Sequence, residues 1–558
     1  MASTPRADSG PPNAPVHRKE CAAHLRLSRV SDGSSVWGVH GGCLLLRNKE
    51  RDQALGKPRV VTTHWQSTSL VKLLPPRRRN QCKPSLKRSL LPLVSMLIGG
   101  LIWAAPAQAA TKHHHYKLID LGTLGGPHSY GSIDGNGAAL LNNSGVVVSY
   151  ADTSSPDPNA AFGCFNPDCF QAHGARWNDG AITDLGALPV NNNSAAGSIN
   201  ARGWAAGQSQ TSVIDPVLGI LEGRAVFWKD GEIIDLGTLE TGTESLGIYV
   251  NDAGQVIGIS TISTAPDPIS FFGSPTHTFI WQNGEKLDIG TLGGDDTFPG
   301  ASCSNPTPGT VVGGSFTSVV PNANTPGLPT VDPFLWRDGK MVDLGTLGGT
   351  NGFAQCVNNR LQIIGQSSVA ANPATCDFPV LTSVGPGCHA FLWENGVMTD
   401  LGTLGGDTSE AVWLNDKGVV VGSADLAGPS GRQTHDAVVW INGKIHDLGT
   451  VPGDACSRGL GLNVRGQVVG DSSDCHNNLH AFLWEDSGPI VDLNTLIPRG
   501  SGVQLTNAFN INDRGEILAK AAPIGFTPND DEDLGHLALL IPCNEQHPNI
   551  EGCDFNEP

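Results

Sequence analysis

The sequence predicts an all-β fold, a β-propeller of four-stranded blades, with eight blades as the simplest count. A phrase that opens with Asp and then Leu or Ile recurs eight times, at intervals of 45 to 64 residues. Asn-Gly or Asp-Gly turns separate short apolar runs within the repeats, and no long apolar stripe with the 3.6-residue helical period accompanies them. A repeat of about 50 residues that holds four short strands is typical of a propeller blade.

The repeated phrase indicates structure rather than chemistry. Its most regular form, DLGTLGG, resembles a glycine-rich phosphate loop, but such a loop needs a helix start and a lysine after the glycines, and neither pattern follows. A catalytic loop occurs once in a domain, whereas this phrase occurs eight times. We expect its glycines to turn the chain from one blade to the next. The phrases begin at Asp120, Asp184, Asp235, Asp288, Asp343, Asp400, Asp447 and Asp492.

A first hairpin leads into each phrase. A strand such as HAFLW (389–393) is followed by an Asn-Gly or Asp-Gly turn, which favours a type I′ hairpin because both central residues need positive φ. Tryptophan stands seven residues before the aspartate in six units and eight before it in a seventh, which sets the register of the two strands. These residues are Trp177, Trp228, Trp281, Trp336, Trp393, Trp440 and Trp484.

A second hairpin follows each phrase. The runs SEAVWLN (409–415) and VVVGSA (419–424) are joined by an Asn-x-x-Gly turn, in which asparagine bonds to its own backbone and glycine accommodates positive φ. Each unit therefore contains four short antiparallel strands. The turn recurs from Asn142, Asn200, Asn251, Asn415, Asn463 and Asn512.

The two ends of the repeat region complement each other. Residues 116–122 form a fourth strand with no first hairpin before it, whereas the chain ends with three strands near 508–512, 516–520 and 536–542. The spare strand at the start can complete the blade at the end. This pairing closes the ring and removes the open sheet edges that promote aggregation.

The pattern HAFLW…DLGTLGG…IN..G.VVG.S over residues 116–542 resembles the HAF-repeat family of extracellular repeat proteins. The resemblance implies an extracellular location and brings no known activity, substrate or catalytic residue. Some copies depart from the family pattern: Asp288 opens DIG, residues 182–188 are ITDLGAL, and the fourth unit has NPTPG in place of the Asn-x-x-Gly turn.

Charge divides the chain near residue 110. Residues 1–110 hold 17 basic and 5 acidic residues, a net of +12, and the remainder holds 18 basic and 48 acidic residues, a net of −30. We expect a signal peptide at 76–109, a propeller at 110–542 and a tail at 543–558. A transmembrane anchor is the alternative for the apolar run, and residues 1–75 are expected to be unstructured or untranslated. The acidic body disfavours nucleic acid as a partner.

Cysteine usage agrees with export. Ten of the 13 cysteines, an even number, lie beyond the expected signal peptide, as in proteins of oxidising compartments. We predict a secreted protein, extracellular or held at the cell surface or in the periplasm. The candidate pairs are Cys164 with Cys169, Cys376 with Cys388, Cys456 with Cys475, and Cys543 with Cys553.

A polar residue precedes each tryptophan by four positions, His536 holds the equivalent place in the last blade, and five of these eight residues are histidines. The repeat places them on different blades, too far apart to share a metal ion, so we expect each to bond to the Asp or Thr of its own DLGT phrase. We predict no metal and no cofactor, with calcium at the acidic run 530–533 as an open alternative. The polar residues are His173, Arg224, His277, Asp332, His389, Asp436, His480 and His536.

Function is sought in the loops between the second and third strands, where the repeats differ most. Aromatic residues among polar ones there suit sugars or proteins, although they could also cap the core. No motif of catalytic residues is found, so we predict a monomeric, non-catalytic protein that binds glycan or protein. The alternatives are an extracellular enzyme acting on polysaccharide or phosphate ester, and a purely structural surface protein. The candidate residues are Phe162, Phe165, Phe170, Phe271, Phe272 and Phe378.

Overall fold

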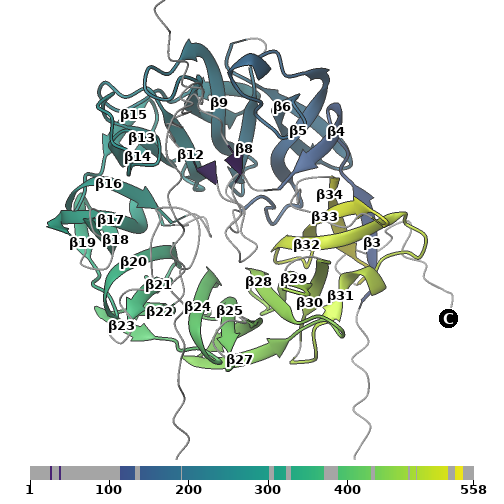
Figure 1. Cartoon of the computed structure of the whole chain (residues 1–558). Coiled ribbons are helices and arrows are strands. Elements are labelled where there is room, and N and C mark those ends of the chain that lie inside the picture. The colour runs from purple at the N-terminus through teal and green to yellow at the C-terminus, as the bar shows by residue number, and fades with distance from the viewer. Residues whose placement is uncertain are drawn as a thin grey trace, which may run out of the picture. The chain divides into compact units, whose positions relative to one another are not determined.

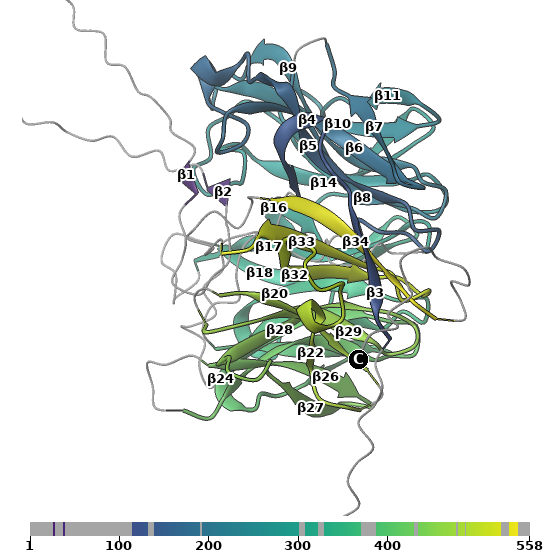
Figure 2. The same cartoon turned by 90° about the vertical axis from the view of Figure 1, so that its right-hand side faces the viewer.

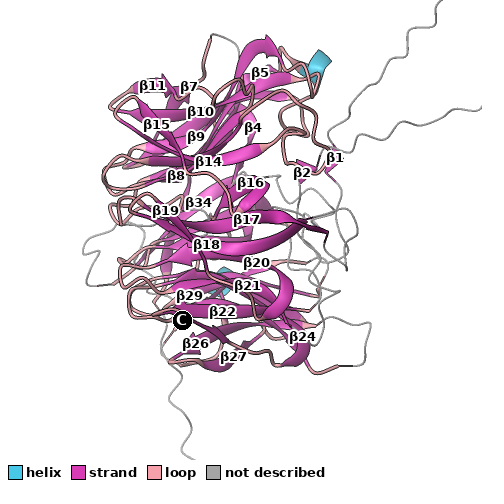
Figure 3. Cartoon of the chain, turned by 90° about the vertical axis from the view of Figure 1, so that its left-hand side faces the viewer, coloured by secondary structure: helices cyan, strands magenta, loops and turns pink. Residues whose placement is uncertain are grey.

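The computed structural model describes residues 26–27, 37–38, 114–131, 139–189, 192–300, 307–321, 329–369, 387–428, 434–475, 478–485, 487–525 and 535–544. Within the compact unit that includes residues 112–558, short antiparallel sheets are arranged around a common centre, which is a β-propeller (Figure 1). Strands make up nearly all of the regular structure (Figure 3). The all-β propeller predicted from the sequence is confirmed.

Six sheets have four strands each, and in each the innermost strand pairs with the next strand along the chain. In four of these sheets, the strands lie in the order of the sequence from the centre outwards. They contain β4 (Gly125–Tyr130), β5 (Val147–Pro156), β6 (Phe170–Asn178) and β7 (Ala181–Gly186); β8 (Ser194–Ile199), β9 (Ala205–Ile214), β10 (Leu221–Lys229) and β11 (Glu232–Asp235); β12 (Ser245–Val250), β13 (Val256–Thr261), β14 (Thr276–Gln282) and β15 (Glu285–Asp288); and β24 (Gly405–Leu414), β25 (Val420–Leu426), β26 (His435–Ile441) and β27 (Lys444–Gly449).

The remaining two four-stranded sheets come from the end of the repeat region. One contains β28 (Cys456–Leu462), β29 (Val468–Ser473), β30 (His480–Trp484) and the short β31 (Val491–Asp492), which continues into the 3₁₀ turn η2 (Leu493–Thr495). The other contains β32 (Val503–Ile511), β33 (Ile517–Pro523), β34 (His536–Pro542) and β3 (Tyr116–Asp120).

One sheet has eight strands. It contains β16 (Gly293–Pro299), β17 (Thr310–Pro321), β18 (Pro329–Arg337), β19 (Lys340–Asp343), β20 (Gly348–Val357), β21 (Ile363–Val369), β22 (Cys388–Glu394) and β23 (Val397–Asp400). Its halves are two sets of four strands joined by a single parallel pair, Val331 with Asn351. The predicted count of eight blades treats these halves as two blades.

The first hairpin has the predicted two-residue turn in six units. Asp or Asn and the Gly after it both adopt positive φ, for example 54° at Asn395 and 83° at Gly396. The same two-residue pattern is present at Asp179, Asp230, Asn283, Asp338 and Asn442. These turns fix the register in which Trp393 pairs with Met398 and Phe391 with Asp400.

The Asn-x-x-Gly turns are linked to one another. In Asn415, Oδ1 accepts hydrogen bonds from the backbone N–H of Lys417 and of Val419, which closes its own turn. Its Nδ2 then donates to the backbone oxygen of Asn463 in the following sheet, at 3.1 Å. The same side-chain-to-backbone link runs from Asn142 to Asn200, Asn200 to Asn251, Asn358 to Asn415, Asn463 to Asn512 and Asn512 to Asn142.

Adjacent sheets are also joined by buried hydroxyl groups. The backbone N–H that follows the polar residue of the third strand donates to a Ser or Thr hydroxyl on the innermost strand of the next sheet, as Ala390 does to Ser409 at 2.9 Å. We refer to these contacts as the seam bonds. The others are Gly174 to Ser194, Ala225 to Ser245, Thr278 to Thr297, Ala437 to Ser457 and Leu537 to Ser129.

The two ends of the repeat region contact each other as the sequence predicts. β3 pairs antiparallel with β34 in a register that places Leu118 opposite Leu540 (Figure 2). The buried cluster that surrounds Trp177 contains Leu537 and Leu539 from β34. Hydrogen bonds and apolar packing therefore both connect the last sheet to the first.

The glycines of the repeated phrase have a packing role. A Cβ at Gly406 would lie 2.5 Å from the Cβ of Asp425 and 2.8 Å from the backbone oxygen of Leu426, so no larger residue fits without displacement of β25. Gly402, at the end of the preceding strand, adopts a φ of 72°. The prediction that these glycines connect blades is consistent with both positions.

Part of the N-terminal region is also described. β1 (Arg26–Leu27) pairs with β2 (Trp37–Gly38). The expected signal peptide at 76–109 and the tail beyond residue 544 lie outside the described residues. Among the residues that the structure does describe, no helix is long and apolar enough to cross a membrane.

Candidate functional site

The aromatic candidates do not form one exposed surface. Among those described, Phe162 alone is an exposed large hydrophobic residue, with 43% of its surface accessible, and it ends the 3₁₀ turn η1 (Ala160–Phe162). Phe165 packs against the buried pair Tyr130 and Tyr150. The alternative that such residues cap the core therefore applies to Phe165.

The other aromatic candidates follow the same trend. Phe272 is buried in a cluster with Phe298 and Phe353, and Phe271 packs against that cluster. Phe170 is half-buried in β6, and Phe378 lies outside the described residues. Of the described candidates, Phe272 is buried, Phe165, Phe170 and Phe271 are half-buried, and Phe162 is exposed, so their role in binding stays a prediction.

The histidines bond within their own sheets, as predicted. In four sheets Nδ1 of the histidine lies 2.8–2.9 Å from a carboxylate oxygen of the repeated aspartate. Burial raises the pKa of Asp288, but the hydrogen bonds from His277 and from the backbone of Gly290 outweigh it and lower that pKa below its usual range. The pairs are His173–Asp184, His277–Asp288, His389–Asp400 and His536–Asp120.

One histidine departs from the prediction. His480 lies 2.9 Å from Asp454 rather than bonding to Asp492. Asp492 instead accepts a hydrogen bond from the backbone N–H of Asn494 and caps η2. The extra residue before Asp492 lies in the turn, because Asp492 still pairs with Phe482 as Asp400 pairs with Phe391, so the backbone register does not explain the change of partner.

Two sheets place a second acid where the histidine stands elsewhere. Burial and the facing Asp343 raise the pKa of Asp332 to about 6. Burial and the facing Asp447 raise the pKa of Asp436 to about 7. These are carboxyl–carboxyl contacts in place of an ion pair.

A further carboxyl pair, Asp152 with Asp168, lies at the start of the first long insertion loop. Asp152 is fully buried at the end of β5, and its carboxylate accepts hydrogen bonds from the Tyr130 hydroxyl at 3.1 Å and from Asn166 Nδ2 at 3.2 Å. The backbone N–H of His128 donates to its second oxygen at 3.0 Å. Asp168 is half-buried and contacts Asp152 through its carboxyl group.

The loop that carries Asn166 and Asp168 is held by a disulfide bond. Cys164 and Cys169 are bonded to each other, as predicted, and enclose the sequence Phe-Asn-Pro-Asp. Oδ1 of Asp168 accepts a hydrogen bond from the backbone N–H of Phe170, while Oδ2 is buried and has no hydrogen-bond partner. The loop therefore presents one carboxylate oxygen of Asp168 toward Asp152.

The contact between Asp152 and Asp168 favours a proton on Asp152. Burial, together with the neighbouring Asp168, raises the pKa of Asp152 to about 7. Burial and the two carboxylates also raise the pKa of Tyr130, which keeps its hydroxyl protonated as a donor. Near neutral pH Asp152 therefore holds a proton in a large part of the molecules.

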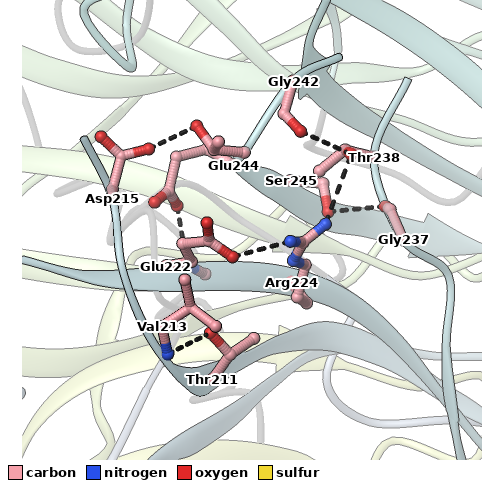
Figure 4. A network of polar contacts seen from close by, with 12 residues as sticks. Thr211, Val213, Asp215, Glu222, Arg224, Gly237, Thr238, Gly242, Glu244 and Ser245 are labelled. Carbon is pink, nitrogen blue, oxygen red and sulfur yellow. Dashed lines mark hydrogen bonds and ion pairs between the residues drawn. The ribbon is translucent and has the colours of Figure 1, made fainter. Parts of the chain in front are cut away.

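A second acidic network joins the β8–β11 and β12–β15 sheets (Figure 4). Glu222 is paired with Arg224 at 2.7 Å. Glu244 accepts from the backbone N–H of Gly223 at 2.8 Å, while its other oxygen is buried without a partner. Burial raises the pKa of Glu244 to about 9, with the nearby Asp215 and Glu222 adding to the shift. Glu244 is therefore a neutral acid at physiological pH.

Comparison of equivalent positions in the sheets indicates that this second network has a structural role. Asn193 accepts from the backbone N–H of Ala172 at 2.8 Å, and Asp296 accepts from that of Thr276 at 2.6 Å, each one residue before the hydroxyl of a seam bond. Glu244 holds the same position before Ser245. The amide of Asn193 and the buried carboxyl groups of Asp296 and Glu244 therefore accept the same backbone hydrogen bond in three sheets. This role does not require a negative charge.

Sequence reasoning missed the Asp152–Asp168 pair. Asp152 partly repeats a structural role, since Gln210 accepts from the backbone N–H of Asn193 just as Asp152 accepts from that of His128. In the other described sheets, the residue at the position of Asp152 has no partners that correspond to Tyr130, Asn166 and Asp168. The available signal was the CFNPDC segment, which occurs once in the chain and is bracketed by cysteines.

The other sequence candidates are partly described. Cys456 and Cys475 are bonded to each other as predicted. Cys388 and Cys543 are disulfide-bonded, as is Cys356, while Cys376, Cys553 and the acidic run 530–533 lie outside the described residues. Within the described part of the chain, no group of three or more His, Cys, Asp or Glu side chains is arranged to hold a metal ion.

Comparison with known proteins finds similarity at the level of fold. The β-propeller domain of the Trilobed protease from Pyrococcus furiosus is 10% identical, with 66% of this chain and 98% of that chain covered and a TM-score of 0.37. The acylaminoacyl peptidase of Pyrococcus horikoshii is 12% identical, with 71% and 58% covered and a TM-score of 0.36. Dipeptidyl peptidase 4 of Porphyromonas gingivalis is 10% identical, with 72% and 60% covered and a TM-score of 0.41.

This chain spans 58% and 60% of the length of the last two peptidases. No family model matches the sequence, and no curated protein matches it. The expectation of a non-catalytic repeat protein that binds glycan or protein is contradicted, because the structural neighbours are propellers of peptidases.

Proposed function

We propose that this chain is an enzyme-associated propeller whose reactive group is the Asp152–Asp168 carboxyl pair, used in hydrolysis of an acyl or peptide bond. The observation that supports the proposal is the contact between the two carboxyl groups, with the pKa of Asp152 raised to about 7. Such a pair holds one proton at neutral pH and so offers an acid and a base side by side.

Hydrolysis uses both members of a pair of this kind. The ionised carboxylate takes a proton from water, the water oxygen bonds to the acyl carbon, and the protonated carboxyl gives its proton to the leaving nitrogen or oxygen. Tyr130 and Asn166 orient the carboxylate of Asp152 from the buried side. Asp168, which is half-buried, is the member nearer to solvent.

Two features favour an acyl substrate over the other classes. Carboxyl groups that hydrolyse glycosidic bonds stand at least about 5 Å apart, whereas these two are in direct contact. The net charge of −30 beyond residue 110 repels phosphate esters. The peptidases among the structural neighbours act on the same class of bond, although their similarity concerns fold only.

The test is hydrolysis by the mature chain, residues 110–558, against panels of peptides and chromogenic esters, with polysaccharides as the contrasting class. We expect Asp168→Asn to abolish hydrolysis and Asp152→Asn to reduce it strongly. The matched control is Asp425→Asn, because Asp425 occupies the place of Asp152 in the β24–β27 sheet and has a pKa raised to about 6, chiefly by burial. Absence of hydrolysis in the unmodified protein, or equal rates in all variants, overturns the proposal.

We also propose export of the chain. Two disulfide bonds within the described residues support an oxidising compartment. Amino-terminal sequencing of the protein recovered outside the producing cells is expected to begin at residue 110. Recovery of the protein in the cytoplasm with residues 76–109 attached contradicts this proposal.

A further inference from the structure

One position in the propeller carries a histidine in several sheets. The residue four places before the tryptophan faces the aspartate of the repeated phrase, and in four sheets it is a histidine with Nδ1 2.8–2.9 Å from the carboxylate. The aspartate is fixed by a second bond, since Oδ1 of Asp400 accepts from the backbone N–H of Gly402 at 2.7 Å. The second carboxylate oxygen is thus presented toward the histidine.

The β24–β27 sheet retains the fixed carboxylate and lacks the histidine. Oδ1 of Asp447 accepts from the backbone N–H of Gly449 at 2.8 Å, as in the histidine-bearing sheets. The residue that faces it is Asp436. Two acceptors therefore meet where other sheets have an acceptor and a donor.

Asp436 has an oxygen that remains unsatisfied. The residue is 7% exposed, and its Oδ1 is buried with no hydrogen-bond partner. Asp447 is exposed, so the pair is open to solvent on one side. A buried carboxylate oxygen without a partner beside a second carboxyl group is costly, and a proton or a bound cation can remove that cost.

We propose that Asp436 and Asp447 bind a hydrated divalent cation, Mg²⁺ or Ca²⁺, which takes the place of the histidine found in the other sheets. Mg²⁺ commonly binds proteins through one or two carboxylates and keeps several of its waters. This coordination needs no third acidic side chain, and the exposed side of Asp447 provides room for the waters. Asp332 and Asp343 form a second, less buried copy of the arrangement.

The test compares thermal unfolding of the mature chain with and without millimolar Mg²⁺ or Ca²⁺, at matched ionic strength. A ligand that binds only the folded state raises the unfolding temperature in a saturable manner. We expect such a shift in the unmodified protein. Asp436→His installs the pair seen in four other sheets, so we expect it to fold and to lose most of the shift, with the rest removed by Asp332→His.

The opposite substitution, histidine to aspartate, controls for indirect effects of the Asp436→His substitution. His389→Asp places a carboxylate opposite Asp400 and is expected to increase the cation-dependent shift. Titration with Mn²⁺, followed by the electron paramagnetic resonance signal of the free ion, counts the sites directly. No saturable shift in the unmodified protein, or an equal shift in the Asp332→His/Asp436→His variant, overturns the proposal.

Discussion

Among the described sheets, Pro333 and Gly352 face each other across a seam where both groups of the seam bond are missing. Pro333 has no backbone N–H, and Gly352 has no hydroxyl; a Cβ at Gly352 would lie 2.9 Å from Cδ of Pro333. At the same seam Val331 and Asn351 form a parallel backbone pair, which joins two sets of four strands into the eight-stranded sheet. Direct strand pairing thus occurs where the side-chain link is absent.

This relationship predicts strong coupling between the two positions. Gly352→Ser alone is expected to destabilise the fold by about 1–3 kcal/mol, because its Cβ collides with the proline ring. Adding Pro333→Ala removes the ring and restores an N–H donor, so the double variant is expected to recover stability. Urea unfolding of the two single variants and the double variant measures the coupling; additive effects contradict the prediction.

An intact seam bond can be removed at Ser194. Its hydroxyl accepts from the backbone N–H of Gly174 at 2.9 Å and donates to the oxygen of Gly186 at 2.7 Å. Ser194→Ala leaves both buried groups unsatisfied and is expected to lower the free energy of unfolding by about 1–3 kcal/mol. Ser155→Ala, at an exposed position, serves as the control in the same urea titration. Equal stability of the two variants contradicts the prediction.

Glu244 predicts a particular pH dependence. Its pKa is raised by burial from 4.5 to about 9, so the folded state keeps a proton that the unfolded chain releases. Unfolding therefore releases a proton in this interval, and the free energy of unfolding falls as pH rises from about 4.5 to 9. Glu244→Gln keeps the acceptor for Gly223 and is expected to flatten the fall.

Urea titrations between these pH values compare Glu244→Gln with the unmodified protein. Asn193→Asp is the reciprocal control, because Asn193 fills the same acceptor role one seam earlier. We expect this variant to steepen the fall in stability. The assignment of Glu244 as a neutral acid is wrong if Glu244→Gln leaves the pH profile unchanged.

The disulfide between Cys456 and Cys475 spans the hairpin of β28 and β29, with a sequence separation of 19. Cys456→Ala/Cys475→Ala is expected to cost about 3 kcal/mol of stability, from the loop-closure entropy restored to the unfolded chain. Cys164→Ala/Cys169→Ala, with a separation of 5, is expected to cost less. Chemical denaturation under non-reducing conditions gives the order, and the reverse order contradicts this account.

Removal of β3 tests the link between the two ends of the repeat region. Without residues 110–121, β34 loses the partner that pairs with it from Tyr116 to Asp120 and exposes an edge. We expect this variant to self-associate in size-exclusion chromatography. A shorter deletion of residues 110–114 keeps β3 and should remain unassociated. Equal behaviour of the two deletions contradicts a closing role for β3.

Local patterns in the sequence determined the hairpins and the repeat. Asn395 and Gly396 take the positive φ values that a two-residue turn requires, and this requirement acts between neighbours in the chain. The histidine–aspartate pairs were predictable for the same reason, since the fixed register that pairs Phe391 with Asp400 brings His389 within bonding distance of that carboxylate. Asp492 has the same register, opposite Phe482, yet His480 bonds to Asp454 instead.

Tertiary structure alone decided which polar groups meet outside that register. Asp168 reaches Asp152 because a disulfide-closed loop folds back onto the end of β5, and no sequence period encodes that approach. The aromatic residues of the loops were visible in the sequence, yet packing against other segments placed Phe165 and Phe272 in the core. Turn chemistry depends on adjacent residues, whereas burial and carboxyl contacts depend on distant segments that only the folded chain brings together.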